Sequence, residues 1–383
     1  MQEESPPAQH ISSVINCWQL QGHDIELLHP GNTLGKQYKE EGDKKGLPLI
    51  WERVQKDWNF SQYLANAIQQ HKPEVVYHRY ANSTIFPILR CKLTSVPLVL
   101  EINADLDVDL SGYWGNSRLM RGMIKLLASL QYLLADHIIV VSEGIGDKLR
   151  RKPLINNQKI SVVPNGADLE VFRPLNKLDC RRELALDEEG DYLIFSGKFQ
   201  LYQGVQTILQ VAQQLRNTNP SLKIILVGDG PEEENLRESV EHLNISSEII
   251  FTGWCPPEIT AKYIGASDIC LAPYTSDVLL NPTEKITLGA SMKGSPLKIF
   301  TYLASGRPVI ASHFAEAGQF VKENQVGFDV EPENPTILAD KISTLLLDKE
   351  YLEEMGIRAR AHAETHLGWC SVAGCLADIL AQV

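Results

Sequence analysis

The sequence predicts an α/β protein built from two doubly wound parallel sheets. Short apolar runs, such as residues 97–102 and 223–227, alternate with amphipathic helical segments along most of the chain. Each run is apolar throughout rather than alternately polar, which is typical of strands that helices cover on both faces. At 383 residues and 44% hydrophobic residues, the chain is long enough for two such domains, each with a full core.

The first half of the chain supplies the first of these sheets. Residues 1–9 are polar and interrupted by prolines, so we expect a loop or disorder there. Strands are expected within 23–29 and at 75–77, 97–102, 137–141 and 160–163, and helices at 10–21, 59–70, 85–93 and 117–134. Ligands bind beyond the carboxyl ends of parallel strands, so the polar residues after 75–77 and 97–102 are either binding groups or ordinary strand ends.

The predicted helix at 117–134 places three basic residues, Arg118, Arg121 and Lys125, among leucines, isoleucine and methionine. Such a basic amphipathic helix is either a crossover helix with a solvated face or a surface that touches an anionic membrane weakly.

A turn separates the two halves. Asn165-Gly166 supplies the positive φ that a tight turn after the strand at 160–163 requires. Residues 175–190 are charged and poor in helical pattern, so they are interpreted as an interdomain connection. We therefore predict an N-terminal domain at 1–174 and a C-terminal domain at 175–365. Strands of the second sheet are expected at 192–196, 223–227, 249–252, 269–272 and 309–311, and residues 276–293 as an insertion rich in Gly and Ser.

The stretch 294–312 is the strongest candidate for a ligand-binding element. Ser295 is a good N-cap, Pro296 suits a first helical turn, and Gly306 suits the position after the C-cap. Apolar residues cover most of the helix, and Lys298, Thr301 and Ser305 form one polar stripe. A lysine in the first turn of such a helix favours an anion, above all a diphosphate. The alternative is a core helix whose lysine extends to solvent.

Composition and missing motifs exclude several classes of protein. The net charge of −12 and a pI near 5.4 argue against nucleic acid as a partner. Neither a dinucleotide-binding Gly-x-Gly-x-x-Gly after a first strand nor a cluster with metal-ligand spacing occurs, so a dehydrogenase and a metal site are disfavoured. Seven scattered cysteines favour reduced thiols, and no signal peptide or long apolar run is visible, so a cytoplasmic location is expected.

The sequence Ser295-Pro-Leu-Lys298, followed by Tyr302 and Gly306, resembles the signature helix of retaining GT-B glycosyltransferases of family four, in their Ser-Pro-Leu-Lys branch. The resemblance extends from about residue 10 to the end and includes Pro164-Asn-Gly and Val227-Gly-Asp-Gly. It implies two Rossmann-like domains, with a last helix within 366–383 that packs back on the first domain. It also implies retaining transfer of a hexose from a UDP- or GDP-linked sugar to a sugar, lipid or small-molecule acceptor, without a cofactor or metal.

The resemblance also assigns roles to residues, with Asn103 at a position where many relatives carry a histidine. The catalytic candidates are Lys198, Lys298 and Asn103. The donor-binding candidates are Gly197, Gln203, Gly228, Trp254, Ser295, Pro296, Leu297 and Thr301. The acceptor-side candidates are His78, Glu101, Asp105 and Asn165.

Three departures from the family pattern leave a second function open. Thr301 stands where relatives carry a glutamate that holds the ribose, and Gln203 stands where they usually carry a lysine. The first apolar strand and its Gly-rich loop are also missing, which indicates either a late annotated start or a real loss. The alternative function is therefore a weak or inactive homologue that acts as a binding or scaffold partner.

Overall fold

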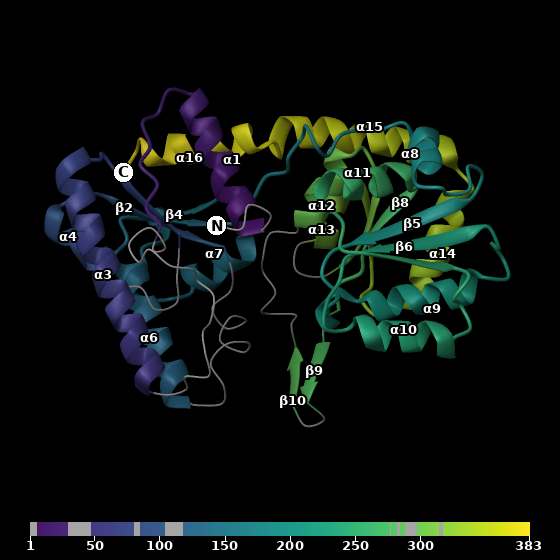
Figure 1. The fold of residues 1–383 in the computed structure, drawn as a ribbon, viewed down its shortest axis with the longest axis horizontal. Coiled ribbons are helices and arrows are strands. Elements are labelled where there is room, and N and C mark those ends of the chain that lie inside the picture. The colour runs from purple at the N-terminus through teal and green to yellow at the C-terminus, as the bar shows by residue number, and fades with distance from the viewer. Residues whose placement is uncertain are drawn as a thin grey trace. The chain divides into compact units, whose positions relative to one another are not determined.

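The computed structural model describes residues 6–29, 47–79, 85–103, 118–275, 277–281, 284–287, 297–313 and 317–383 (Figure 1). The chain divides into two compact units. The first unit comprises Met1–Pro164, Lys293–Ser295 and Ala373–Val383, and the second comprises Asn165–Met292 and Pro296–Val372.

The first unit contains a parallel sheet in the order β1-β2-β3-β4. Its strands are β1 (Val76–Arg79), β2 (Leu98–Ile102), β3 (His137–Val140) and β4 (Ile160–Val162). Every residue of β2 is buried, Glu101 included, which fits a mostly apolar strand covered on both faces. The register aligns Arg79 with Glu101 and His78 with Leu100.

Helices cover both faces of this sheet. On one face, α3 (Leu47–His71), α4 (Phe86–Thr94) and α6 (Arg118–Leu134) bury leucine, isoleucine and alanine side chains against β2 and β3. On the other face, α1 (Pro6–Leu20) meets α16 (Trp369–Leu380), where the indole of Trp18 donates a hydrogen bond to the carbonyl of Ala373 at 2.8 Å. The short helices α7 (Glu143–Arg150) and η1 (Asn157–Lys159) complete the described part of the unit.

The second unit contains a six-stranded parallel sheet in the order β12-β11-β8-β5-β6-β7. Its strands are β5 (Asp191–Ser196), β6 (Leu222–Val227), β7 (Ile249–Gly253), β8 (Ile269–Ala272), β11 (Val309–Ser312) and β12 (Gly327–Val330). β9 (Asp277–Asn281) and β10 (Glu284–Thr287) form a separate antiparallel pair within the stretch predicted as an insertion.

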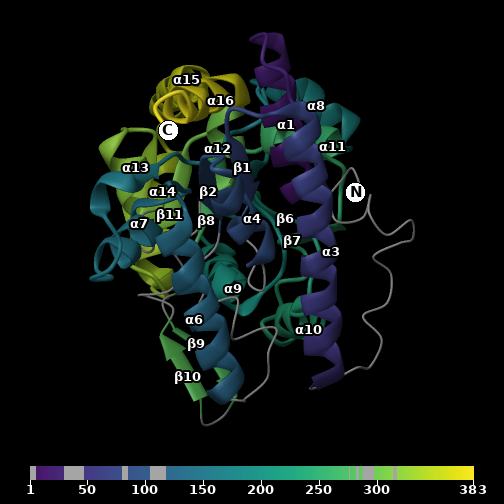
Figure 2. The same ribbon diagram turned by 90° about the vertical axis from the view of Figure 1, so that its left-hand side faces the viewer.

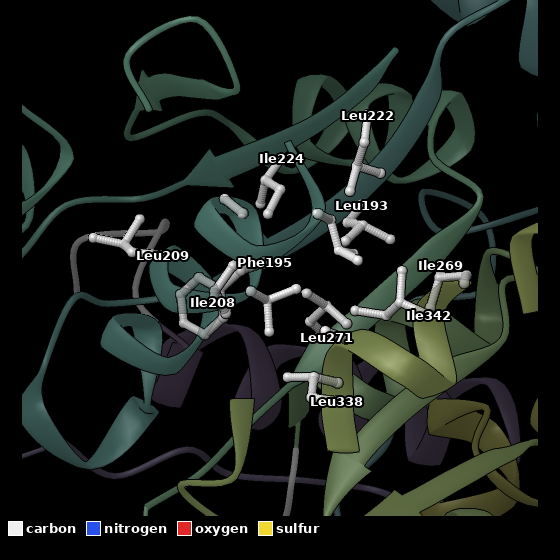
Figure 3. Close-up of a cluster of buried hydrophobic side chains, with 14 of the residues drawn as sticks. Leu193, Phe195, Ile208, Leu209, Leu222, Ile224, Ile269, Leu271, Leu338 and Ile342 are labelled. Atoms are coloured by element: carbon white, nitrogen blue, oxygen red, sulfur yellow. The ribbon is translucent and has the colours of Figure 1, made fainter. Parts of the chain in front are cut away.

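Helices enclose this sheet from both sides. They are α8 (Lys177–Glu183), η2 (Leu201–Gln203), α9 (Val205–Leu215), α10 (Glu233–His242), α11 (Pro257–Ala266), α12 (Leu297–Ala304), α13 (Ala317–Glu323), α14 (Pro335–Leu346) and α15 (Lys349–His366). Figure 3 shows the core on one side, where Leu193 and Phe195 of β5 pack against Ile208 of α9 and Leu338 of α14.

Three predictions about local structure are wrong. Residues 6–9, expected as loop or disorder, form the first turn of α1, because prolines are tolerated at the start of a helix. Residues 23–29 form no strand, because none of the described residues provides a hydrogen-bonded neighbouring strand for them. The connection at 175–190 contains helix α8, which Asn176 caps by accepting a hydrogen bond from the Asp179 amide at 3.1 Å. One of its charged residues is docked rather than solvated, since buried Arg181 bonds to Asp268 at 3.0 Å.

The expectation of reduced thiols is wrong at two positions, because Cys17 and Cys370 are disulfide-bonded in the structure. Cys91, Cys180 and Cys270 are free and buried, as their apolar surroundings dictate. Within the described ranges, no helix is both long and apolar enough to cross a bilayer. The cytoplasmic location stays a prediction.

Candidate active site

The strand order of the six-stranded sheet reverses between β5 and β8. The chain moves from β5 outwards to β6 and β7, and then returns to place β8 on the opposite side of β5. At such a switch point, the connections that leave the two central strands diverge and open a crevice at their carboxyl ends. The residues that follow β5 and β8, Gly197 and Tyr274, therefore lie where a parallel sheet of this kind binds its ligand.

Glycines bring the backbone together at this edge. Gly197 and Gly228 have φ values of 145° and 133°, a region that favours glycine. A Cβ on Gly228 would lie 2.1 Å from the carbonyl oxygen of Gly197. The amide of Gly197 donates to Val227 at 2.9 Å, and that of Gly228 to Gly253 at 2.9 Å. The two strand ends therefore pack directly against each other and form a surface of bare backbone at these two positions.

Lys298 of α12 reaches over this surface. A Cβ on Gly197 would lie 3.2 Å from Lys298 Nζ, so the absence of a side chain at Gly197 makes room for the ammonium group. The Nζ atom lies 3.8 Å from the ring centre of Phe195 and 5.1 Å from that of Tyr274. It also donates a hydrogen bond to the side-chain carbonyl of Gln203. Two aromatic rings and one amide thus hold the cation.

Burial lowers the pKa of Lys298 well below its ordinary value. Among the described residues no carboxylate contributes to that pKa, so within them the ammonium has aromatic and amide partners but no counter-ion. A phosphate group at this position would supply the missing negative charge and restore the protonated form. The arrangement is therefore suited to bind an anion and to stabilise negative charge that develops on it.

Helix α12 is fixed against the sheet by its own side chains. Tyr302 is fully buried, and its hydroxyl accepts a hydrogen bond from the backbone N–H of Ser196 at 2.7 Å. Burial raises the pKa of this hydroxyl well above its usual range. Thr301, one residue earlier, donates its hydroxyl to the carbonyl of Lys298 at 2.8 Å. The Thr301 hydroxyl therefore bonds to the backbone of its own helix in this structure.

The other donor-side candidates differ in exposure. Lys198 directly follows Gly197 in the chain and is exposed, and Gln203 is buried under Lys298. Trp254 follows β7 with 55% of its surface exposed, and Leu297 begins α12 with 38% exposed. Ser295 and Pro296 lie outside the described residues. The structure thus brings Gly197, Gln203, Gly228 and Lys298 together at the strand ends, and leaves Lys198 and Trp254 in solvent beside them.

A second polar cluster lies at the carboxyl end of β2 in the first unit. Glu101 is almost fully buried, and its carboxylate lies 3.1 Å from Nε2 of His10 on α1. Burial alone would raise the pKa of Glu101, but His10, Arg79 and Asn103 outweigh it and the pKa lies below its usual value. Burial and the nearby Glu101 carboxylate raise the pKa of Tyr77 well above its usual range.

The structure separates the acceptor-side candidates. Side chains alternate along a strand, so the register places Arg79 on the same face as Glu101, and His78 on the opposite face. Burial lowers the pKa of His78 to about 4, which leaves its imidazole neutral at pH 7. Asn165 is buried in the second unit. Asp105 lies outside the described residues.

Three residues of these clusters were missed by sequence reasoning: His10, Phe195 and Tyr274. Phe195 is the last apolar residue of β5 and Tyr274 follows β8, so the switch point between those strands is the signal that identifies them. His10 carries no such signal, because its partner Glu101 is distant in the sequence.

Comparisons with known proteins agree with this architecture. Residues 8–171 match the model of Glycosyltransferase Family 4, and residues 176–362 match the model of Glycosyl transferases group 1. The two matches together account for nearly the whole chain. The chain belongs to the group 1 glycosyltransferases, and its fold is GT-B: two α/β units, each built on a parallel sheet.

The chain is similar to proteins of several organisms. The sulfoquinovosyl transferase of Arabidopsis thaliana is 26% identical over 322 residues, which are 82% of this chain and 58% of that protein. A D-inositol 3-phosphate glycosyltransferase of Corynebacterium glutamicum is 30% identical over 232 residues, 58% of this chain and 51% of the relative. The chain thus spans about half the length of the curated relatives it matches.

Among solved structures, HepE of Anabaena in complex with UDP has a TM-score of 0.68 at 16% identity, covering 85% of this chain and 82% of that one. At this level of identity, the similarity between the two structures shows a shared fold.

Proposed function

We propose that this protein transfers a hexose from a nucleotide diphosphate sugar to a sugar, lipid or small-molecule acceptor, with retention of the anomeric configuration. The donor is a UDP- or GDP-linked sugar, and no cofactor or metal ion takes part. The observation that carries the proposal is the position of Lys298, whose ammonium group has no carboxylate partner among the described residues and lies beside the bare backbone of Gly197 at the switch point.

The proposed reaction breaks the bond between the anomeric carbon and the diphosphate oxygen, and it forms a bond from that carbon to an acceptor hydroxyl. The hydroxyl proton leaves with the released diphosphate or to solvent. Negative charge grows on the diphosphate as the bond breaks, and Lys298, Lys198 and the N-terminal amides of α12 stabilise it. Gly197 leaves room for the Lys298 ammonium, Gly228 lets the two strand ends pack closely, and Gln203 holds the ammonium in place.

The acceptor side of the proposal belongs to the first unit. Glu101 is the second-last residue of β2 and Asn103 directly follows the strand, so both lie at its carboxyl end, the edge at which parallel sheets bind ligands. An ionised carboxylate there is a good acceptor for sugar hydroxyls. Helix α6, basic and amphipathic, adds weak peripheral membrane contact to the proposal.

A thermal-shift titration of the purified chain with UDP, GDP, ADP and their sugar conjugates tests the donor site. We expect a rise in melting temperature with one nucleotide class and its conjugates, since a ligand that binds only the folded state stabilises it. Lys223→Met, at a lysine of β6 that bonds to the Ser247 carbonyl at 2.8 Å, is the control and should keep the shift. A cooperative melt that no nucleotide raises would refute the donor site.

The competing function is that of a weak or inactive homologue which acts as a binding or scaffold partner. Thr301 favours it, because relatives with this motif carry an acid there and the Thr301 hydroxyl already bonds to the Lys298 carbonyl. Turnover of a nucleotide sugar that raises the melting temperature decides between the two: release of nucleoside diphosphate supports the enzyme, and binding without release supports the scaffold.

A further inference from the structure

Helix α6 has a second apolar face that points away from the protein. Its inner face, which includes Ile124, Ala128 and Tyr132, is buried against the four-stranded sheet. Met123, Leu126, Leu130 and Leu133 are all exposed, with Leu126 at 62%. Their spacing of three, four and three residues places them in one line on a helix of 3.6 residues per turn. We call these four residues the outer stripe.

The neighbouring helices extend this surface. Figure 2 shows α3 and α6 on the same face of the sheet, with α4 between them. On α3, Trp51 and Trp58 lie seven residues apart on one helix face, and Trp51 is 71% exposed. Trp58 also packs edge-on against Phe86 at the start of α4, with ring centres 5.3 Å apart. An exposed apolar line flanked by tryptophans is typical of a surface that meets lipid headgroups and acyl chains together.

The charge on these helices has the opposite sign to that of the whole chain. The chain carries −12, but α4 and α6 contain no acidic residue. Their basic residues are Arg90, Lys92, Arg118, Arg121 and Lys125. Lys92 pairs with Asp136, and three aspartates precede α6 in the sequence, outside the described residues. The apolar line therefore supplies most of the affinity, and the cations set the preference for an anionic surface.

We propose that the outer stripe of α6, with the tryptophans of α3, docks this protein on the surface of an anionic lipid bilayer. Helices α3 and α6 each precede a parallel strand, so their N-terminal ends lie at the edge where the strands have their carboxyl ends. Glu101 and Asn103 lie at that same edge. A docked bilayer is therefore close to the acceptor side of the unit, and, resting on the proposed function, the acceptor is carried by a lipid.

Co-sedimentation with vesicles tests the proposal. We expect the wild-type chain to bind vesicles of phosphatidylcholine with phosphatidylglycerol more tightly than vesicles of phosphatidylcholine alone. The double variant Leu126→Glu/Leu130→Glu should bind at least tenfold more weakly, because two exposed leucines that would enter the bilayer become two charges. Arg90→Gln/Lys125→Gln should lose roughly fivefold per charge on anionic vesicles and nothing on neutral ones.

The matched control is Leu347→Glu/Ile357→Glu, which changes an exposed leucine and an exposed isoleucine of the second unit. Their exposed fractions are 88% and 71%. It should bind vesicles as the wild type does. The proposal is overturned if the outer-stripe variant binds vesicles as tightly as the wild type. It is also overturned if the wild type binds neither kind of vesicle. A wild-type dimer in sedimentation that the outer-stripe variant converts to a monomer, with no change in vesicle binding, also overturns it.

The nucleotide thermal shift, measured on the same variants, separates this proposal from the proposed function. A normal shift together with absent vesicle binding refutes the docking surface alone. Vesicle binding without any nucleotide shift refutes the donor site and leaves the docking surface standing.

Discussion

The side-chain carbonyl of Gln203 accepts a hydrogen bond from the ammonium group of Lys298. The resemblance to the family implies that relatives usually carry a lysine at the position of Gln203, and here an uncharged amide at that position contacts the Lys298 cation. The pair joins η2, which follows β5, to the first turn of α12 across the switch point of the sheet. The position of the Lys298 ammonium group therefore depends on its hydrogen bond to Gln203.

Gln203→Ala tests this dependence. The change removes the acceptor of a partly buried ammonium, so we expect the free energy of unfolding of the chain to fall by about 1–3 kcal/mol. Urea denaturation followed by circular dichroism measures it. Gln206→Ala on α9, which removes an exposed hydrogen bond to Ser239, is the control and should cost less than about 0.5 kcal/mol. Equal effects at the two positions would show that the Gln203 contact is unimportant.

Lys298→Met tests the anion site itself. Methionine keeps the length and apolar stem of lysine but has no charge, so nucleotide affinity should fall about ten- to 150-fold, the worth of a charge-assisted hydrogen bond of about 1.5–3 kcal/mol. Stability should stay the same or rise, because a desolvated amine is removed. Isothermal titration calorimetry measures the affinity. A large loss of stability with unchanged affinity would make Lys298 a core residue.

The pH dependence of stability provides an independent test of the Lys298 environment. Burial holds its folded-state pKa below its ordinary value of about 10.4, so the unfolded chain binds more protons than the folded chain between the two values. Burying the charged Lys298 lowers the free energy of unfolding. This cost is complete below the folded-state pKa and disappears as the pH rises from the folded-state pKa to the unfolded-state pKa. Wild type should therefore gain stability relative to Lys298→Met between pH 7 and pH 10. A constant difference between them would contradict the lowered pKa.

Much of the fold could be predicted because parallel strands buried on both faces are predominantly apolar rather than alternately polar. β5, β6 and β8 lie within one residue of their predicted bounds for this reason. The strand expected within 23–29 was wrong because a strand depends on a neighbour that local pattern does not reveal. Helix α8 was missed because its charges suggested solvent, whereas Arg181 is neutralised by Asp268, 87 residues later.

The candidate site was predictable where a single segment carries it, as with Lys298 on its helix and Gly197 at its strand end. Its aromatic partners were not, since Phe195 and Tyr274 come from strands that meet only in the folded sheet. Pairing across the sheet also decides that His78 and Glu101 lie on opposite faces, which a sequence pattern cannot register.

Asp268→Asn tests the ionic anchor of α8. The carboxylate is almost fully buried and accepts hydrogen bonds from Lys177 at 2.8 Å, from Arg181 at 3.0 Å and from the backbone N–H of Tyr192 at 2.8 Å. Removing the charge leaves buried Arg181 unpaired, so the free energy of unfolding should fall by about 3–5 kcal/mol. Asp340→Asn, at an exposed position of α14, is the control and should change stability by less than about 0.5 kcal/mol. Urea denaturation compares the two, and a cost below about 1 kcal/mol at Asp268 would show that α8 docks by apolar contacts alone.

Thr301→Glu tests whether the donor site has been weakened at the position where relatives carry an acid. Thr301 is on the second turn of α12, three residues after Lys298, and its hydroxyl bonds to the Lys298 carbonyl. A carboxylate there accepts charge-assisted hydrogen bonds from ribose hydroxyls, so UDP or GDP should bind about tenfold more tightly or better. Thr301→Val removes only the hydroxyl and should leave affinity unchanged, which separates the new acceptor from the lost helix bond. Calorimetric titration of the three proteins measures both effects. If the glutamate variant binds no better than wild type, the carboxylate does not meet the ribose, and the alignment that equates Thr301 with the family's acid is wrong.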